Sequence, residues 1–322
     1  MPAFTATAPG KIILFGEHAV VYGRPAIAVP VAGVKARAVV SADPRAAPGK
    51  VRLQAPDIGL EASLDKLPET HPLAAAVRAV LAALGLSRSP ACLLRVTSTI
   101  PVASGLGSGA AVTVALARAY SAFLGQPLAD ERVSALTFEI EKLHHGTPSG
   151  IDNTVITYAM PVYFQRRAGE APMIETFTVP EPFQVVIGDT GVRSPTAVSV
   201  GDVRKAWLAD TPRYERLFDE IGSISQAARK AIEAGRPFEL GPLMDENQAL
   251  LRQAGVSSPE LDRLIQAAKS AGALGAKLSG GGRGGNMIAL VEDRAVAGVV
   301  QALQAAGAVR SLVTQVKGRR PD

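Results

Sequence analysis

The segment "PVASGLGSGAAV" at residues 101–112 constrains the chain most, because three glycines and two serines stand directly before an alanine-rich run. A glycine-rich turn that leads into a helix leaves backbone N–H groups bare, and the helix dipole adds positive potential there. The segment contains no Asp or Glu. It therefore favours a phosphate site, although glycines that only let a helix pack closely on a strand would give the same pattern.

Two familiar nucleotide-binding patterns do not match this early glycine segment (residues 101–112). The P-loop needs four residues between its first glycine and a Gly-Lys-Ser/Thr string, and the sequence has no such string. The dinucleotide fingerprint is G-x-G-x-x-G with an acid at the end of a second strand. Here Gly105, Gly107 and Gly109 give G-x-G-x-G, and a helical pattern follows.

The length and the hydrophobic pattern predict an α+β protein of two lobes. At 322 residues the chain exceeds the usual size of a single core. Strand-like runs dominate early and helical periodicity dominates later, which is typical of α+β proteins. We expect one lobe over residues 1–185 and a second over 186–322.

Periodicity and turn residues predict individual elements. Asp130 is the expected N-cap of a helix whose apolar stripe includes Leu143. We expect helices over 71–85, 106–124 and 130–146, strands near 154–165 and 184–190, three amphipathic helices over 211–272, and a final strand, glycine loop, strand, helix and strand.

Charge, cysteine usage and hydropathy limit the class of partner. The net charge of +5 suits an anionic small ligand, and the scattered basic residues do not favour nucleic-acid binding. The single cysteine, Cys92, lies in the apolar stretch "ACLLRV" and is expected to be a buried strand thiol. With no secretory signal and no apolar run of about 18 residues, the sequence predicts a cytoplasmic protein that does not span a membrane.

Three further stretches combine charged residues with turns. They are "APGKIILFGEHAVVYG" at 8–23, "EKLHHGTPSGIDNTV" at 141–155 and "TGVRSPT" at 190–196. A second glycine-rich loop, "KLSGGGRGGN", stands at 277–286 between two expected strands. With these motifs in this order, nearly the whole chain resembles the GHMP small-molecule kinases, and among them the mevalonate kinases.

The resemblance implies a fold and a reaction. The N-terminal lobe would be like ribosomal protein S5 domain 2 and the C-terminal lobe ferredoxin-like, with ATP and Mg²⁺ used to phosphorylate the primary hydroxyl of mevalonate. A kinase with another acceptor, such as phosphomevalonate, and a non-catalytic ligand-binding relative are the alternatives. Dimers are common in the family, so a homodimer is a further expectation.

The resemblance also assigns catalytic and metal-binding roles. Asp152 matches the catalytic aspartate, and Lys11 matches the lysine beside it, which would polarise the acceptor hydroxyl. Glu141 matches the magnesium-binding glutamate, with Ser108 as a second ligand. Without the resemblance, Asp152 would be an ordinary turn residue, Lys11 a solvated lysine and Glu141 a helix-surface partner of His145.

Substrate contacts follow from the same comparison. Glu17 and His18 match residues near the mevalonate carboxylate and hydroxyls, and Thr196 matches a substrate-side threonine. Arg193 could bind the substrate carboxylate or lie on the surface. The expected ATP-binding residues are Pro101, Ser104, Gly105, Leu106, Gly107, Ser108, Gly109 and Ala110.

Two positions depart from the family pattern. Gly109 replaces a serine that helps to bind magnesium, which leaves Ser108, water or Glu141 and the phosphates to complete the metal shell. Arg283 replaces a glycine in the second glycine-rich loop. It would either contact phosphate or point to solvent.

Overall fold

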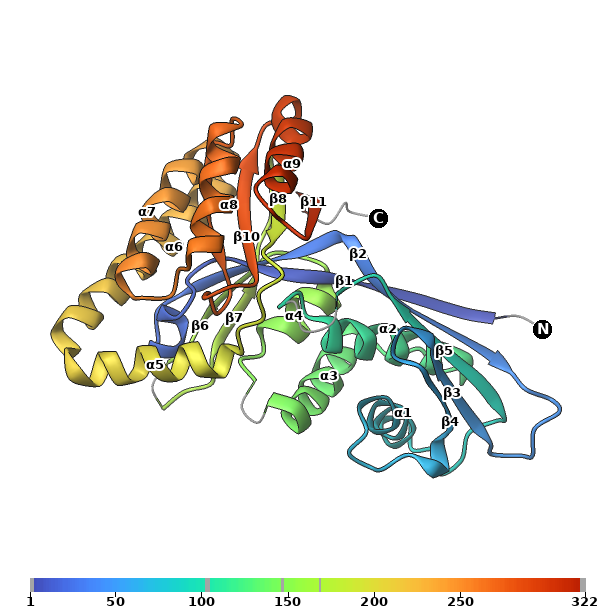
Figure 1. Cartoon of the computed structure of the whole chain (residues 1–322). Helices are drawn as coiled ribbons and strands as arrows, with labels where there is room; N and C mark the ends of the chain where they lie inside the picture. Colours follow the sequence, from blue (N-terminus) through green and yellow to red (C-terminus); the bar gives the residue numbers. More distant parts are fainter. Residues whose placement is uncertain (1–2, 102–104, 146–147, 168, 319–322) are drawn as a thin grey trace. The chain divides into compact units, whose positions relative to one another are not determined.

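A computed structural model describes residues 3–101, 105–145, 148–167 and 169–318 (Figure 1). Within it the chain forms two compact units. The first unit comprises residues 3–10, 34–101 and 106–159, and the second comprises 11–33, 105 and 160–318. Strands β1 (Ala3–Phe15) and β2 (Ala26–Ala42) pair with each other, and each contributes residues to both units.

The first unit combines a sheet with a group of helices. Its strands follow the order β4-β3-β5-β2, with β3 and β5 parallel and the other pairs antiparallel. The added strands are β3 (Val51–Ala55), β4 (Leu60–Ser63) and β5 (Cys92–Ser98). The helices are α1 (Pro72–Ala83), α2 (Ser108–Phe123), α3 (Asp130–His145) and α4 (Ile151–Tyr158). Short 3₁₀ turns lie at Pro56–Ile58 and Leu64–Lys66.

Helix α2 is the centre of the first unit's core. It packs against β5 and against α1, α3 and α4. Most of its buried residues are small, which lets the neighbouring helices approach its backbone closely. The alanine-rich run of the sequence is therefore the packing surface that places the early glycine segment next to α3 and α4.

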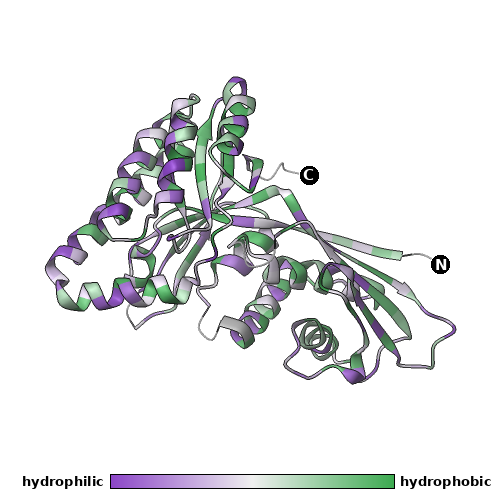
Figure 2. Ribbon diagram, viewed as in Figure 1, coloured by the Kyte–Doolittle hydropathy of each residue, from purple (hydrophilic) through white to green (hydrophobic). Residues whose placement is uncertain are grey.

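The second unit contains a four-stranded antiparallel sheet in the order β11-β8-β10-β9. Its strands are β8 (Phe183–Asp189), β9 (Gly275–Ser279), β10 (Asn286–Val291) and β11 (Arg310–Val316). Numbered along the chain, this order is 4-1-3-2, and with helices in the crossovers it is the ferredoxin-like arrangement. Figure 2 shows that β8 and β10 are largely hydrophobic, and β10 is buried at every position.

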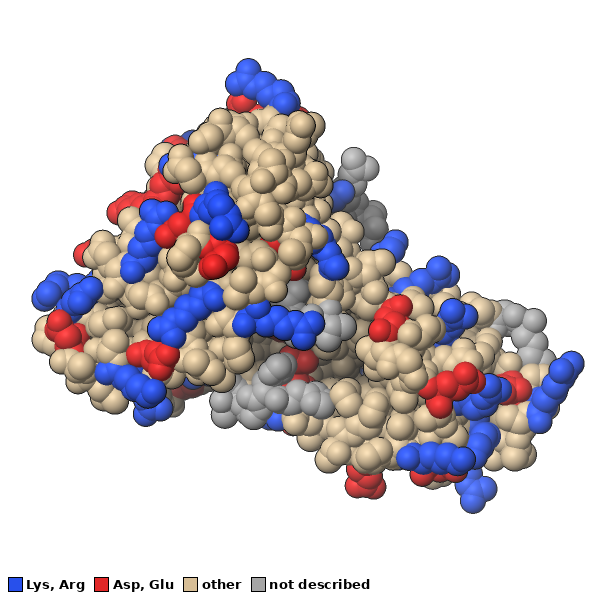
Figure 3. Space-filling view, viewed as in Figure 1, with Lys and Arg blue, Asp and Glu red and all other residues tan. Residues whose placement is uncertain are grey.

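Within the described chain, five helices accompany this sheet, of which the last three contact its strands and the first two pack on other helices, and a short extra pair of strands extends β2. The helices are α5 (Thr196–Ala209), α6 (Thr211–Glu233), α7 (Leu240–Gln253), α8 (Pro259–Ser270) and α9 (Val296–Ala305). Strands β6 (Val162–Gln165) and β7 (Met173–Thr176) continue from the first part of β2, and 3₁₀ turns lie at Ala19–Tyr22 (η1), Pro237–Glu239 and Asp293–Ala295. On the face seen in Figure 3, basic and acidic side chains are interspersed.

Most of the predicted elements are confirmed. Helices α1 to α3 and α6 to α9 and strands β5 and β8 to β11 lie where the sequence predicts them. Cys92 is a fully buried strand thiol. Among the described residues no helix combines the length and the apolar character that a bilayer crossing requires.

Three local predictions are wrong. The strand expected near 154–165 is helix α4 up to Tyr158 and becomes a strand only at Val162. Asp130 is the first residue of α3, and the Val133 amide donates to the Ala129 carbonyl, so Ala129 stands at the N-cap position in place of Asp130. Leu143 is 53% exposed, so the apolar stripe of α3 ends before it.

The predicted boundary between the two lobes, between residues 185 and 186, stays a prediction. The compact units divide the chain elsewhere, at residues 159 and 160, and the second unit also includes residues 11–33. This early segment pairs through β2 with β6, which explains why contacts group it with later residues.

Candidate active site

The early glycine segment forms a turn followed by a helix N-terminus. Gly105 and Gly107 have φ angles of 75° and 73°, in the left-handed region that favours glycine, and Gly107 is the N-cap of α2. Leu106 and Ala110 are buried, whereas Gly105 and Gly109 are exposed. This geometry is the one that the glycine pattern predicts. Pro101 is half-buried, and Ser104 lies outside the described residues.

Glu141 lies against this helix N-terminus. It is a buried residue near the end of α3, and a Cβ added at Gly109 would stand 3.2 Å from its Oε1 atom. A side chain at position 109 would therefore require the end of the Glu141 side chain to shift slightly.

The residues at this point suit a magnesium ion that keeps water and phosphate ligands, and not an ion bound by protein ligands alone. Mg²⁺ is usually held by one or two carboxylates together with water and substrate phosphates. The structure places one buried carboxylate, Glu141, beside an exposed helix N-terminus. Within the described ranges, no group of three or more His, Cys, Asp or Glu side chains could hold a metal ion.

Asp152 is the second residue of helix α4 and is half-buried. Gly150 caps the helix with a φ angle of 89°, and the Ile151 amide donates to the Ser149 hydroxyl at 3.2 Å. Helix α4 is fixed to α3 by the Asn153 amide, which donates to Ser134 Oγ at 2.9 Å. The sequence placed Asp152 in a turn; the structure places it at a helix N-terminus, a position that suits an anionic side chain.

The first unit thus gathers three of the predicted sites in one group of helices. The early glycine segment begins α2, Glu141 lies near the end of α3, and Asp152 begins α4. All three helices pack against one another. Their grouping brings the elements that carry these three predicted sites into one packed cluster.

In the second unit, a tight GEH turn (residues 16–18) follows β1. Gly16 has a φ angle of 95°, and a Cβ added there would lie 2.5 Å from the Cα atom of Ala26. No other residue fits at this position. His18 has a φ angle of 61°, which is uncommon outside glycine. Strain of this kind is most often kept where function requires it.

The chain beyond the GEH turn is anchored to α6. The Tyr22 ring stacks on Phe218 with centroids 4.1 Å apart. The Arg24 guanidinium binds Asp219 at 2.7 Å and Glu215 at 2.5 Å. These contacts fix the direction in which η1 leaves the turn.

Glu17 makes a buried ion pair that the sequence analysis did not anticipate. The ammonium of Lys277, on β9, donates to Glu17 Oε1 and to the Leu278 carbonyl. The Glu17 side chain is 1% exposed and the Lys277 side chain is 0% exposed. Burial raises the pKa of Glu17 and lowers the pKa of Lys277, and the attraction within the pair opposes both shifts. Glu17 Oε2 has no hydrogen-bond partner among the described residues.

The protonation state of the buried His18 ring follows from its surroundings. Burial, reinforced by the charge of Arg283, lowers the pKa of His18 from 6.5 to about 4, so the ring is neutral at pH 7. Its Nε2 atom lies 3.1 Å from the Gly281 carbonyl oxygen. Because a carbonyl only accepts, Nε2 carries the proton and Nδ1 is an acceptor. That Nδ1 atom is buried without a partner in the described part of the chain.

The late glycine loop (residues 280–285) joins the GEH turn to helix α5. Gly281 accepts from His18, and a Cβ at Gly281 would lie 3.1 Å from Thr196 Oγ1 and 3.0 Å from Ser199 Oγ. A Cβ at Gly282 would lie 2.0 Å from the Val256 carbonyl oxygen. Close approach thus leaves no room for a side chain at Gly282 and little at Gly281. Three predicted substrate residues, Glu17, His18 and Thr196, meet at this loop.

Arg283 has a role that neither expectation named. It adopts a φ angle of 58°, and its guanidinium binds Asp202 of α5 at 2.5 Å and the Gly255 carbonyl at 3.3 Å. The hydrogen bond from Arg283 is the main cause of the lowered pKa of Asp202. Arg283 therefore fastens the late glycine loop to α5.

The remaining predicted residues are described individually. Arg193 is exposed in the segment before α5, and Lys11 is half-buried on β1. Their roles, like those of the other site residues, stay predictions. The side chains of His144 and His145 lie outside the described part of the chain.

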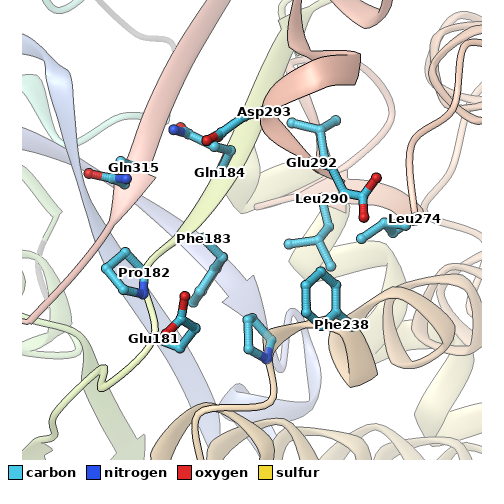
Figure 4. Close-up of a pocket in the computed structure, with 12 residues that line it drawn as sticks. Glu181, Pro182, Phe183, Gln184, Phe238, Leu274, Leu290, Glu292, Asp293 and Gln315 are labelled. Atoms are coloured by element: carbon cyan, nitrogen blue, oxygen red, sulfur yellow. The ribbon is translucent and has the colours of Figure 1, made fainter.

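A cavity of about 410 Å³ opens elsewhere in the second unit (Figure 4). Phe183, Phe238 and Leu290 form part of its apolar wall, and Glu181 and Glu292 lie among its polar residues. No predicted site residue lines it. The cavity is therefore separate from the chemistry assigned to this unit.

Comparisons with known proteins agree with both units. The family pattern described as GHMP kinases N terminal domain matches residues 72–160, and GHMP kinases C terminal matches 228–309. The mevalonate kinase of Thermococcus sibiricus is 36% identical over 330 residues, with 97% of this chain and 95% of that protein covered. The mevalonate kinase of Pyrococcus furiosus is 37% identical over 316 residues, with 90% and 89% covered.

A solved structure has the same fold. The L. major mevalonate kinase in complex with R-mevalonate superimposes with a TM-score of 0.83 at 31% identity, covering 98% of this chain and 97% of that one. These matches define the class: the chain is a GHMP kinase, a phosphotransferase with an alcohol as acceptor and ATP as co-substrate. Within this class it belongs to the mevalonate kinase family. The predicted fold class and family resemblance are confirmed.

Sequence reasoning missed Lys277 and Asp202. The one signal for Lys277 was a lone lysine inside an otherwise small and apolar strand, "LGAKLSG". A fully buried lysine needs a partner of opposite charge, but the sequence does not indicate which acid provides it.

Proposed function

We propose that this protein transfers the γ-phosphoryl group of ATP to the primary hydroxyl of mevalonate, which gives 5-phosphomevalonate and ADP. The observation that carries the proposal is the 36% identity to a mevalonate kinase across 97% of the chain. The GEH turn and the Asp152 segment, which the sequence analysis singled out, lie within that aligned length.

Asp152 is the proposed acceptor of the hydroxyl proton. Phosphoryl transfer to an alcohol needs an oriented hydroxyl and neutralisation of charge on the phosphates. The N-terminus of α4 holds the Asp152 carboxylate in place through Gly150 and through the contact of Asn153 with α3. Lys11 is the proposed cation that polarises the same hydroxyl.

The N-terminus of α2 is the proposed phosphate site. Exposed glycine backbone at 105 and 109 and the absence of acids in the early glycine segment support close approach of a phosphate group. Mg²⁺, when bound, would neutralise charge on the β- and γ-phosphates. Glu141 and Ser108 are the residues that would hold it, together with water and phosphate oxygens.

The proposed substrate contacts begin with the GEH turn. The unpartnered atoms of Glu17 and His18 are both acceptors, so they suit hydroxyl groups of the substrate. The expectation that these residues also lie near the substrate carboxylate stays a prediction. We propose Arg193 for the carboxylate, which it could bind through two parallel hydrogen bonds, and Thr196 for a substrate oxygen.

The test is coupled ADP release with Mg-ATP and a panel of mevalonate, phosphomevalonate, homoserine and galactose. Turnover with mevalonate well above the others is expected. Preference for another acceptor would change the proposed substrate and leave the assignment as a kinase unchanged. No turnover by folded protein that binds ATP would favour a non-catalytic relative.

Asp152→Asn tests the proposed proton acceptor. It should lower kcat by at least about a hundredfold, the scale of general-base catalysis, with Mg-ATP affinity largely kept. Asp65→Asn, which removes an exposed carboxylate paired with Lys50, is the matched control and should retain full turnover. Near-normal kcat in folded Asp152→Asn protein would remove Asp152 from the catalytic role.

Two further expectations belong with this proposal. We propose a homodimer from the family resemblance, and a cytoplasmic location because a single cysteine, which cannot form an internal disulfide, suits a reducing compartment. Light scattering of the purified protein would give 33.4 kDa for a monomer and twice that mass for the proposed dimer.

A further inference from the structure

Lys277 is a buried charged side chain for which the proposed mechanism has no use. It stands in the middle of β9, paired across the sheet with Ile288 of β10, and its side chain is fully buried. Its Nζ atom contacts Glu17 and the Leu278 carbonyl, and the Phe15 ring centroid lies 5.9 Å away. The only carboxylate with which it pairs in the described chain is therefore in the GEH turn.

We propose that Lys277 is a positioning residue for phosphoryl transfer: through Glu17 it holds the GEH turn against the late glycine loop and so sets the two unpartnered acceptor atoms of Glu17 and His18. This inference rests on the proposed function, because it takes those acceptors to receive the substrate hydroxyls.

Two bonds join the same two segments. Lys277 binds Glu17, and four residues further on Gly281 accepts from His18. Since Glu17 and His18 are neighbours in the turn and Lys277 and Gly281 lie on one strand and its loop, each bond restrains the other. Without the Lys277 contact the Glu17 carboxylate keeps only backbone contacts, one of them with Gly280, so its direction is less restrained and the acceptor geometry changes with it.

Stability alone is a weak reason for this pair. A buried ion pair is often no more stabilising than well-packed apolar side chains of the same size, because both charges lose their hydration. A methionine on β9 would fill similar space without that cost. What an apolar residue could not do is keep a buried carboxylate charged and fix its direction.

The test compares Lys277→Met with the wild type and with Lys269→Met, whose ammonium pairs with Asp245 on the surface of the same unit. In Lys277→Met the KM for mevalonate should rise by at least about tenfold, the loss typical of a charged hydrogen bond, while the KM for Mg-ATP stays near the wild-type value. Lys269→Met should match the wild type in both constants.

A pH profile separates positioning from general damage. The charged groups that act on this turn are Lys277 from β9 and Arg283 from the late glycine loop, which acts on His18. Without the ammonium, the buried Glu17 carboxyl takes up a proton more readily, so kcat/KM for mevalonate in Lys277→Met should climb with pH where the wild type is flat.

The variant pair Glu17→Gln and Glu17→Gln/Lys277→Met completes the test. If Lys277 acts through Glu17, the second substitution adds little to the first in the KM for mevalonate. The double variant removes both charges together, so it can still be compared with Glu17→Gln if Lys277→Met alone is unstable.

The inference and the proposed function fail separately. A wild-type protein without mevalonate turnover overturns the proposed function. An active wild type with a folded Lys277→Met variant of unchanged mevalonate KM and pH profile overturns the role of Lys277, as does an equal rise in KM for both substrates.

Discussion

His18 combines a positive φ angle of 61°, burial of its ring and a hydrogen bond to the late glycine loop. The positive φ angle and the burial of a ring nitrogen without a partner in the described chain both cost free energy, and the hydrogen bond offsets part of that cost. Together they hold a neutral imidazole with its acceptor nitrogen fixed. The residue therefore serves as a rigid hydrogen-bond acceptor and not as a titrating base near pH 7.

This burial predicts how stability depends on pH. The pKa of His18 is about 4 in the folded protein and 6.5 when exposed. As the pH falls below 6.5, the unfolded chain takes up a proton that the folded chain refuses, so the free energy of unfolding falls. The loss continues to about pH 4 and reaches up to about 3 kcal/mol.

Urea unfolding of the wild type and of His18→Gln between pH 7 and 4 measures this contribution. Carboxyl groups titrate in both proteins, so only the difference between the two curves reports His18. The wild type should lose more stability than the variant over this range. Two curves that differ by a constant offset would show that His18 does not titrate differently on unfolding.

At the scale of elements, the late glycine loop is the connector of the second unit. Arg283→Gly tests whether its side chain fastens the loop to α5 or serves a phosphate. The pair with Asp202 is about one-third exposed on each side, and glycine relieves the φ angle of 58°. These effects oppose each other, so the free energy of unfolding should change by no more than about 1 kcal/mol.

The KM for Mg-ATP decides between the two roles. Because the guanidinium already binds Asp202 and Gly255, this constant should remain close to the wild-type value in Arg283→Gly. Asp202→Asn is the matched control, since it breaks the same pair and leaves the arginine. A severalfold rise in Arg283→Gly alone would assign Arg283 to phosphate binding.

Long amphipathic helices could be predicted from the sequence, and short or exposed ones could not. Helix α4 has only eight residues and is rich in β-branched side chains, which favour strands, so its packing against α2 and α3 decides its conformation. Helix α5 buries only Ser199 and Val203, and so it lacks the apolar stripe that reveals a helix.

The site was predictable where its residues share a local motif. The early glycine segment, Asp152 and the GEH turn each stand in one short stretch of sequence. The Lys277–Glu17 pair spans 260 positions and the Arg283–Asp202 pair spans 81. Such pairings follow from strand order and loop packing, which periodicity does not report.

For the whole molecule, single-copy residues provide a probe in each unit. Cys92 is buried in β5 of the first unit, and burial raises its pKa to about 11. Trp207 lies in α5 of the second unit, where its indole donates to Glu215 at 2.8 Å. The sequence contains one cysteine and one tryptophan.

We expect the two units to unfold cooperatively, and these two probes can report it. Because β1 and β2 each supply backbone to both units, we expect thiol reactivity and tryptophan fluorescence to change at the same urea concentration. The native thiol should be inert, since a buried thiol with a raised pKa forms little thiolate. Midpoints that differ clearly between the two probes would mean that the units unfold independently.

The interrupted chain path has a consequence for dividing the protein. The second unit takes residues 11–33 from the beginning of the chain and the rest from residue 160 onward. A polypeptide that starts at residue 160 would carry the Lys277 ammonium without the Glu17 carboxylate, and the Gly281 carbonyl without the His18 donor. Two halves cut between 159 and 160 should therefore be unstable when made separately and should regain structure only by complementing each other, as in a split-protein assay.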